Sequence, residues 1–116
     1  MLIDNKLMDK NSKKILYTSI NQSGRFFSIG TEVGFQVYNA NPLKLKVDRK
    51  FEGGVSIIEM FYNSNILALV GTGQNTEYPL NRLIFWDEYK RKIICNLTYN
   101  CYINNVRLKN DKYALI

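Results

Sequence analysis

Two apolar runs dominate the hydrophobic pattern of the chain, and a short polar break separates them. Residues 57–61 (IIEMF) and 66–70 (ILALV) are rich in β-branched and aromatic side chains, and the polar residues 62–65 (YNSN) lie between them. Runs this short, bounded by Gly and Asn, predict two strands joined by a hairpin turn. Their almost continuous apolarity favours strands that are covered on both faces, as in the middle of a stack of sheets.

The pattern recurs along the chain at a spacing in the forties. Gly30-Thr31 matches Gly71-Thr72 at an offset of 41, and residues 34–39 (GFQVYN) match residues 82–87 (RLIFWD) at an offset of 48. The difference of seven residues is an insertion between Thr72 and Arg82. A repeat of this length with about four strands per unit is typical of β-propeller blades.

Two further features support the repeat. Residues 106–110 match residues 59–63 at an offset of 47, which predicts the start of a third copy. Tyr38-Asn39 and Trp86-Asp87 lie where WD repeats carry their Trp-Asp dipeptide. The repeat therefore predicts an all-β fold made of two four-stranded propeller blades and the start of a third.

The repeat also divides the chain. Residues 1–14 form an N-terminal extension, residues 15–54 the first blade, residues 55–100 the second blade, and residues 101–116 the first strands of the third blade. Since a ring needs at least about four blades to close, we expect the chain to be the N-terminal part of a larger protein, either as a truncated product or as a fragment. The alternative is an independent all-β sandwich of about ten strands.

Strand bounds follow from the turn residues and from alternation. We expect strands at residues 15–21, 26–30, 35–39 and 43–51 in the first blade, and at residues 83–87 and 91–97 toward the end of the second. The stretch at 43–51 alternates, which predicts a half-exposed outer strand. Its apolar face would hold Leu43, Leu45 and Val47, and its polar face Lys44, Lys46 and Asp48.

Composition narrows the class of protein. With 46% hydrophobic and 22% charged residues, the chain is not a disordered tail. No apolar run approaches the roughly 18 residues of a membrane-spanning helix, and the first 14 residues are too polar for a signal peptide, so we expect a cytosolic or cytosol-facing chain. Cys95 and Cys101 fit buried, reduced thiols better than a disulfide framework.

Catalytic and metal-binding chemistry finds little support. The chain contains no His, its two cysteines lack metal-ligand spacing, and Gly71-Thr72-Gly73 lacks the Lys of a phosphate-binding loop. Glu59, within an apolar run, is interpreted as a hydrogen-bonded structural carboxylate, and Trp86 as a core residue. We therefore predict no enzymatic activity, no catalytic residue, no bound metal and no cofactor.

The net charge of +6 comes from 16 basic and 10 acidic residues. The basic residues fall in three groups, at residues 10–14, 44–50 and 90–92. Because these groups lie in expected turns and outer strands, we interpret them as a solvated rim. General attraction to anionic membranes is the next interpretation, and nothing favours a nucleic-acid partner.

The order of motifs resembles a known family. Residues 30–43 (GTEVGFQVYNANPL) are similar to the first blade of the PROPPINs, the seven-bladed WD-repeat-like propellers that include the WIPI proteins. Residues 51–54, 58–60, 65–71 and 78–82 continue the similarity, and the IFWD string with Trp86-Asp87 resembles the branch with the human WIPI proteins. The resemblance covers nearly all of residues 15–116 and implies a partial seven-bladed propeller.

This resemblance implies a non-enzymatic membrane adaptor. The family binds phosphatidylinositol 3-phosphate, and often the 3,5-bisphosphate, on endosomal, vacuolar and forming autophagosomal membranes. It recruits autophagy machinery, notably a lipid-transfer protein, so the implied location is cytoplasmic and peripheral on those membranes. The main rival is a WD-type scaffold for protein partners that binds no lipid.

The sequence departs from the family at the lipid site. The family's head-group pockets are organised around a Phe-Arg-Arg-Gly-type motif in a later blade, and these 116 residues contain no adjacent arginines. We therefore assign no lipid-binding residue to this chain.

The insertion at residues 73–81 is the candidate site. In related PROPPINs the loop at this position lies on the surface that engages the lipid-transfer partner, and Tyr and Arg are enriched at binding hot spots. The alternative is a long hairpin loop without a partner. The start of the insertion is polar, and we expect it to be mobile. The assigned partner-binding residues are Tyr78, Pro79, Leu80, Asn81 and Arg82.

Overall fold

The computed structural model describes residues 14–109 and 113–115, which form strands and turns and contain no helix. The first sheet contains β1 (Ile15–Ile20), β2 (Phe26–Thr31), β3 (Gly34–Ala40) and β4 (Leu43–Lys50) in that spatial order. The second contains β5 (Val55–Met60), β6 (Ile66–Gly71), β7 (Arg82–Asp87) and β8 (Lys92–Thr98). A third sheet pairs β9 (Arg107–Lys109) with β10 (Tyr113–Leu115).

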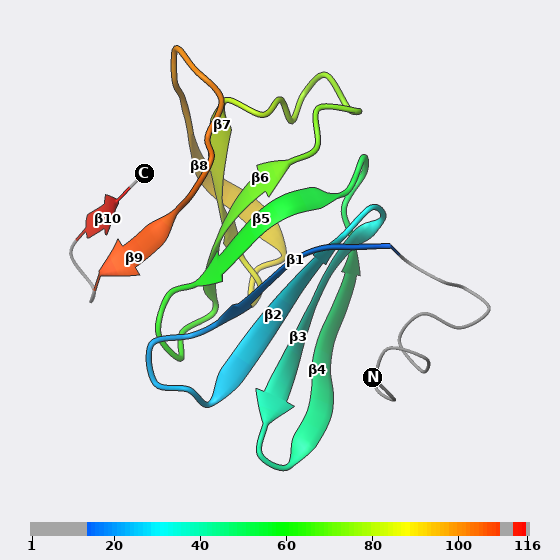
Figure 1. Cartoon of the computed structure of the whole chain (residues 1–116), viewed down its shortest axis with the longest axis vertical. Helices are drawn as coiled ribbons and strands as arrows, with labels where there is room; N and C mark the ends of the chain where they lie inside the picture. Colours follow the sequence, from blue (N-terminus) through cyan, green and yellow to red (C-terminus); the bar gives the residue numbers. More distant parts are fainter. Residues whose placement is uncertain (1–13, 110–112, 116) are drawn as a thin grey trace.

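Each four-stranded sheet is an antiparallel meander, and the two sheets lie side by side with β1 beside β5 (Figure 1). This arrangement confirms the all-β prediction and the expected strands, whose bounds differ by one residue at most ends. The predicted N-terminal extension lies almost entirely outside the described residues.

The main core lies between the two sheets. Phe35 and Val37 of the first sheet pack with Ile58, Leu67 and Leu69 of the second, and all five are buried. A second core covers the other face of the second sheet, where Val70 and Leu83 pack with Ile103 and Val106. The second sheet is therefore covered on both faces, as its continuous apolar runs predict.

Polar side chains join the corresponding ends of the two sheets. Ser19 Oγ donates to the Ile58 carbonyl at 2.8 Å, and Asn21 Nδ2 donates to the Tyr62 carbonyl at 2.9 Å and to Asn63 Oδ1 at 2.7 Å. Asn21 is buried, and its Oδ1 accepts from the backbone N–H of Phe26. The first turn of each sheet is thereby held against its neighbour.

The repeated glycines have a packing reason. A Cβ on Gly30 would lie 2.6 Å from the carbonyl oxygen of Val55, in the first strand of the next sheet. A Cβ on Gly71 would lie 2.6 Å from both the Cβ and the carbonyl oxygen of Tyr78. Glycine therefore permits a close approach at the end of the second strand in each sheet.

A bulge alters the expected faces of β4. Val47 pairs with Val37 and Leu45 pairs with Tyr38, so Lys46 is an extra residue in the ladder. Because Val37 and Tyr38 point to opposite faces of β3, Leu45 and Val47 do as well, and the prediction that they share one face is wrong. The bulge also brings Lys46 to the face that looks toward the second sheet, where its ammonium lies 5.4 Å from the centroid of the Phe26 ring.

The cysteine prediction is also wrong in part. Cys95 and Cys101 are free thiols, but both are exposed rather than buried. Cys95 lies on β8, the outer strand of its sheet, and Cys101 lies in the segment that follows. Among the described residues there is no helix able to cross a membrane.

Candidate partner-binding surface

The insertion connects β6 to β7, and we call residues 73–82 the partner loop. Its backbone closes on itself: the Gly73 N–H donates to the Tyr78 carbonyl at 3.2 Å, and the Tyr78 N–H donates to the Asn75 carbonyl at 2.9 Å. Asn75 Oδ1 also accepts from the Glu77 N–H at 2.9 Å. The polar start of the loop, which we expect from the sequence to be mobile, thus makes hydrogen bonds within the loop.

Tyr78 points inward. Its ring packs against Phe51 with centroids 4.5 Å apart, and its backbone lies against Gly71. Phe51 is buried in the main core, so Tyr78 anchors the partner loop to the link between the two sheets. The sequence predicts that Tyr78 contacts a partner, whereas in the structure its ring packs against Phe51 inside the protein.

Arg82 lies at the other end of the partner loop, at the start of β7. Its Nη1 donates to the Glu77 carbonyl at 2.7 Å and its Nε to Thr98 Oγ1 at 3.1 Å. Both bonds are exposed to solvent. The guanidinium therefore holds a defined position across the base of the loop at the surface of the second sheet.

Leu80 and Asn81 join the partner loop to a second segment. The Ile103 N–H donates to the Leu80 carbonyl at 2.9 Å, and the Tyr99 N–H donates to the Asn81 carbonyl at 2.8 Å. Asn81 Nδ2 in turn donates to the Tyr99 carbonyl at 2.9 Å. The five predicted residues, from Tyr78 to Arg82, are consecutive, and each of them is half-buried.

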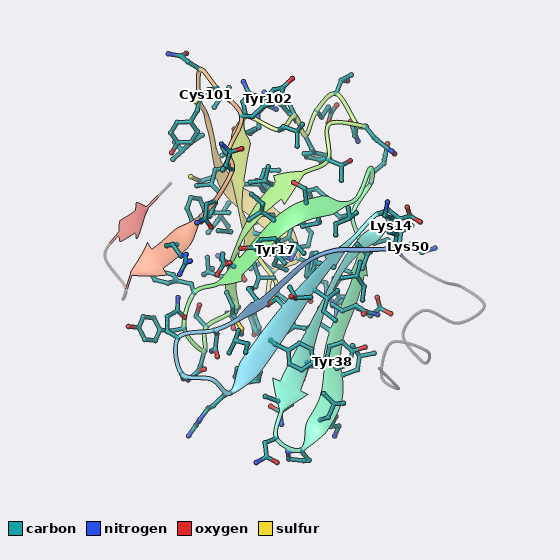
Figure 2. The ribbon with its side chains drawn as sticks, in the orientation of Figure 1. Lys14, Tyr17, Tyr38, Lys50, Cys101 and Tyr102 are labelled. Atoms are coloured by element: carbon teal, nitrogen blue, oxygen red, sulfur yellow. The ribbon has the colours of Figure 1, made fainter. Side chains whose placement is uncertain are left out.

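Sequence reasoning missed the neighbouring segment, residues 99–105. Tyr99 and residues 101–105 line a hollow of about 440 Å³, and Tyr102 is 68% exposed. Figure 2 shows Cys101 and Tyr102 on the connection between β8 and β9, near the partner loop. No repeat motif includes Tyr102, so no signal in the sequence indicated it.

Glu59 has the structural role that the sequence predicts. Its Oε2 accepts a hydrogen bond from the Tyr17 hydroxyl at 2.6 Å, across the boundary between the sheets. Burial raises the pKa of Glu59, against the hydrogen bond from Tyr17 and the charge of Arg107, which lower it. Burial, with help from the Glu59 carboxylate, raises the pKa of Tyr17 to about 12.

Trp86 also matches its interpretation as a core residue, and Gly71-Thr72-Gly73 is the end of β6 and the start of a loop. Trp86 packs edge-on against Phe35 and Phe51 at the margin of the main core, and its Nε1 donates to Glu88 Oε1 at 3.0 Å. Gly71 ends β6, and Thr72 Oγ1 donates to the Gly53 carbonyl. The described residues contain no group of three or more His, Cys, Asp or Glu side chains placed to hold a metal ion.

Comparison with known sequences identifies relatives of this chain. It is 37% identical over 115 residues to SVP1-like protein 2 of Debaryomyces hansenii, a match that covers 93% of this chain and 27% of that protein. It is 34% identical over 110 residues to Autophagy-related protein 18e of Arabidopsis thaliana, covering 92% of this chain and 29% of that protein. The chain belongs to the PROPPIN family.

Solved structures agree on the fold. The crystal structure of Hsv2 from Kluyveromyces marxianus superposes with a TM-score of 0.77 at 16% identity, over 89% of this chain and 32% of Hsv2. KlAtg21, solved in complex with the coiled coil of AgAtg16, superposes with a TM-score of 0.62 at 20% identity, over 82% of this chain and 31% of that one.

The matches cover only a part of each relative. The chain spans less than a third of the length of the relatives named above, so the two sheets are a partial propeller. Models of known protein families give no match to the chain.

Proposed function

We propose that this chain forms one part of a PROPPIN adaptor that binds phosphatidylinositol 3-phosphate and the 3,5-bisphosphate in its full-length form. The adaptor acts without catalysis, resides in the cytoplasm and on phagophore, endosomal or vacuolar membranes, and recruits autophagy machinery such as the lipid-transfer protein. The observation that carries the proposal is the 34% identity to a protein named for autophagy, over 92% of this chain.

Within that adaptor, this part contributes protein contacts rather than the lipid pocket. Its 116 residues contain no adjacent arginines, the pair whose planar guanidinium groups suit phosphate oxygens. KlAtg21 shares the fold and was solved with a coiled-coil partner, which supports a protein-binding role for the fold. The partner loop is the surface we assign to the lipid-transfer protein.

The geometry of the partner loop suits this role. It is tied to Phe51 by Tyr78, to residues 99–103 by Leu80 and Asn81, and to Thr98 by Arg82. A loop ordered before binding loses less conformational entropy when a partner contacts it. Pro79, Leu80 and Arg82 then present a half-exposed apolar and cationic surface.

A chimera tests the proposal. Residues 15–107 replace the matching segment of the Debaryomyces hansenii relative, and the chimera carries Pro79→Ala with Arg82→Ala. We expect partner binding to weaken by about 1–3 kcal/mol, because both changes fall within one contact surface. Phosphoinositide binding should stay unchanged.

The control is Arg25→Ala, which makes the same change as Arg82→Ala in the β1–β2 turn, at the end of the first sheet away from the partner loop. Unchanged partner recovery in the Pro79 and Arg82 double variant would show that the loop is only a connector. A chimera that recovers protein partners while the full-length protein binds no phosphoinositide would favour the rival, a WD-type scaffold.

A further inference from the structure

The second sheet ends in an uncharged edge strand, and we propose that this strand pairs with its counterpart in a second copy of the chain. Among the described strands β8 pairs only with β7, so it lies at the edge of its sheet (Figure 1). An edge strand presents a row of unpaired backbone N–H and carbonyl groups, to which a further strand adds readily. The two β8 strands thereby join two four-stranded sheets into one continuous sheet.

The first sheet provides an internal comparison for β8. Its outer strand, β4, holds the same place, and each outer strand has one extra residue in its ladder, Lys46 in β4 and Ile94 in β8. The offset of 48 residues therefore holds for the outer strands as well. From the bulge onward β4 has four charged residues, and all their counterparts in β8 are uncharged. The charged residues are Lys46, Asp48, Arg49 and Lys50, and the counterparts are Ile94, Asn96, Leu97 and Thr98.

This difference removes the usual protection of an edge strand. Charged side chains on an edge discourage pairing with another molecule. β4 keeps this protection, whereas Ile94 and Leu97 of β8 are each 46% exposed, and the residues between them are exposed as well. Residues 94–98 therefore present an accessible, uncharged stretch of strand.

The charges beside β8 set the direction of the pairing. Lys90, Arg91 and Lys92 are exposed at the start of the strand, and residues 96–100 at its other end are uncharged. Antiparallel pairing about a two-fold axis places the cationic end of each strand opposite the uncharged end of the other. Parallel pairing would align the cations of both strands, and like charges directly opposite each other are destabilising. Two-fold dimers are also the commonest assembly of identical chains.

A second copy suits this edge better than a flexible segment of another protein. The β8 strand of the second copy is already extended and ordered by its pairing with β7, so dimerisation orders little additional backbone. A flexible segment would lose its conformational freedom when it pairs. The second copy also supplies the uncharged end that the cations require.

The bulge limits the extent of the contact. A bulge interrupts the ladder and increases the local twist of the strand, so the pairing runs over the regular stretch after Ile94, residues 95–98. A contact of this length is smaller than a standard stable interface. The association is therefore weak and depends on the concentration of the protein.

The edge is a different surface from the partner loop. The partner loop connects β6 to β7, and it meets the last residue of β8, where Arg82 Nε donates to Thr98 Oγ1. The inference is independent of the proposed function, and its test involves neither a lipid nor another protein.

Analytical ultracentrifugation of the 116-residue chain under reducing conditions tests the dimer. We expect a monomer–dimer equilibrium that shifts toward dimer as the concentration rises. Ile94→Lys gives β8 the residue that β4 has at this position, and it should weaken dimerisation by about tenfold. Leu43→Lys is the matched control, because it adds the same charge at a side chain that is 48% exposed on the outer strand of the first sheet. This control should dimerise like the unmodified chain.

Disulfide formation locates the contact. An antiparallel two-fold pair places one residue of β8 directly opposite itself, with Cα atoms about 4.5–5.5 Å apart, which lies within the range that a disulfide spans. Variants with a single cysteine at residue 95, 96 or 97 are compared with a variant that keeps only Cys101. Under mild oxidation, one of the three β8 positions should form disulfide-linked dimers at least about tenfold faster than Cys101 does, because the pairing holds its two thiols together.

Three results would overturn the proposal. The first is a chain that stays monomeric at every concentration under reducing conditions. The second is equal weakening by Ile94→Lys and Leu43→Lys, or weakening by Leu43→Lys alone, because the copies would then meet through another surface. The third is disulfide formation at the same rate from Cys101 and from all three β8 positions, which would indicate random collision.

Discussion

The Tyr17 hydroxyl donates to Glu59 Oε2 at 2.6 Å and thereby joins the first strands of two successive sheets. Burial is the main reason that the pKa of Glu59 is raised above its ordinary value, and burial with the hydrogen bond raises the pKa of Tyr17 to about 12. The folded protein therefore favours the neutral form of each group. Because the packing of the two sheets buries both groups, the stability of the sheet boundary depends on pH.

Replacing Glu59 with Gln should remove the part of the pH dependence of folding stability that comes from this side chain. Because its folded pKa lies above the model-compound value of 4.5, the folded state binds the Glu59 proton more tightly than the unfolded state does. That stabilisation is complete below about pH 4.5 and is lost as the pH rises through the folded pKa. Glu59→Gln keeps a neutral hydrogen-bonding group, so the variant should lack this loss and be at least as stable as the wild type at about pH 7.

Urea unfolding from about pH 4.5 to pH 7, followed by Trp86 fluorescence, measures the difference. Glu52→Gln makes the same change at an exposed side chain and serves as the control. If Glu59→Gln is less stable than the wild type at neutral pH by more than about 1 kcal/mol, the carboxylate charge stabilises the sheet boundary and our account of Glu59 is wrong.

Leu69 should contribute far more stability than Leu97. Leu69 is fully buried between the sheets, and Leu97 is 46% exposed on the outer strand. Truncating a buried Leu removes packing on all sides, so Leu69→Ala should cost about 2–5 kcal/mol. Leu97→Ala, the same chemical change, should stay within about 0.5 kcal/mol. Chemical denaturation of both variants checks this, and similar losses would contradict the two-sheet core.

The strands could be predicted because their signals are local. Strands and turns follow from short stretches of sequence, namely the apolar runs at 57–61 and 66–70 and the repeated glycines at 30 and 71. The role of Glu59 was also predictable, since a lone acid in an apolar run needs a hydrogen-bond donor. Its donor, Tyr17, lies 42 residues away and could not be identified from the sequence.

The predictions that were wrong concern features set by contacts between residues far apart in the sequence. Strict alternation places Lys46 outward, but the bulge opposite Val37 turns it toward the second sheet, and that bulge exists only in the β3–β4 pairing. Cysteine is usually buried, yet Cys95 lies on an outer strand and is exposed. Tyr78 looks like a free aromatic in its loop, but Phe51, 27 residues earlier, turns it inward.

Removing the Tyr78 ring should loosen the partner loop. The ring packs on buried Phe51, so Tyr78→Ala should cost about 1–3 kcal/mol, whereas Tyr78→Phe keeps the ring and should stay close to the wild type. Amide hydrogen exchange at Gly73 and Tyr78 reports the loop's own hydrogen bonds. We expect faster exchange at both amides in the Ala variant only. Unchanged exchange would show that the loop is ordered without its aromatic anchor.

The chain alone should not distinguish phosphoinositides from other anionic lipids. Its 116 residues lack adjacent arginines, and its net charge of +6 includes exposed lysines spread over β4 and the β7–β8 turn. Such charges attract any anionic surface, and this attraction between exposed charges weakens as salt shortens the screening length to about 8 Å at physiological ionic strength.

Vesicle flotation measures this prediction. Vesicles containing phosphatidylinositol 3-phosphate are compared with phosphatidylserine vesicles of equal negative charge, first at low salt and then at physiological salt. We expect equal binding to both at low salt and equal loss from both as salt rises, because unspecific surface charge carries the interaction. Charge-reversed Lys46 and Lys90 variants should lose binding to both vesicle types in parallel. Retention of the 3-phosphate vesicles alone at physiological salt would instead place a selective head-group site within these 116 residues.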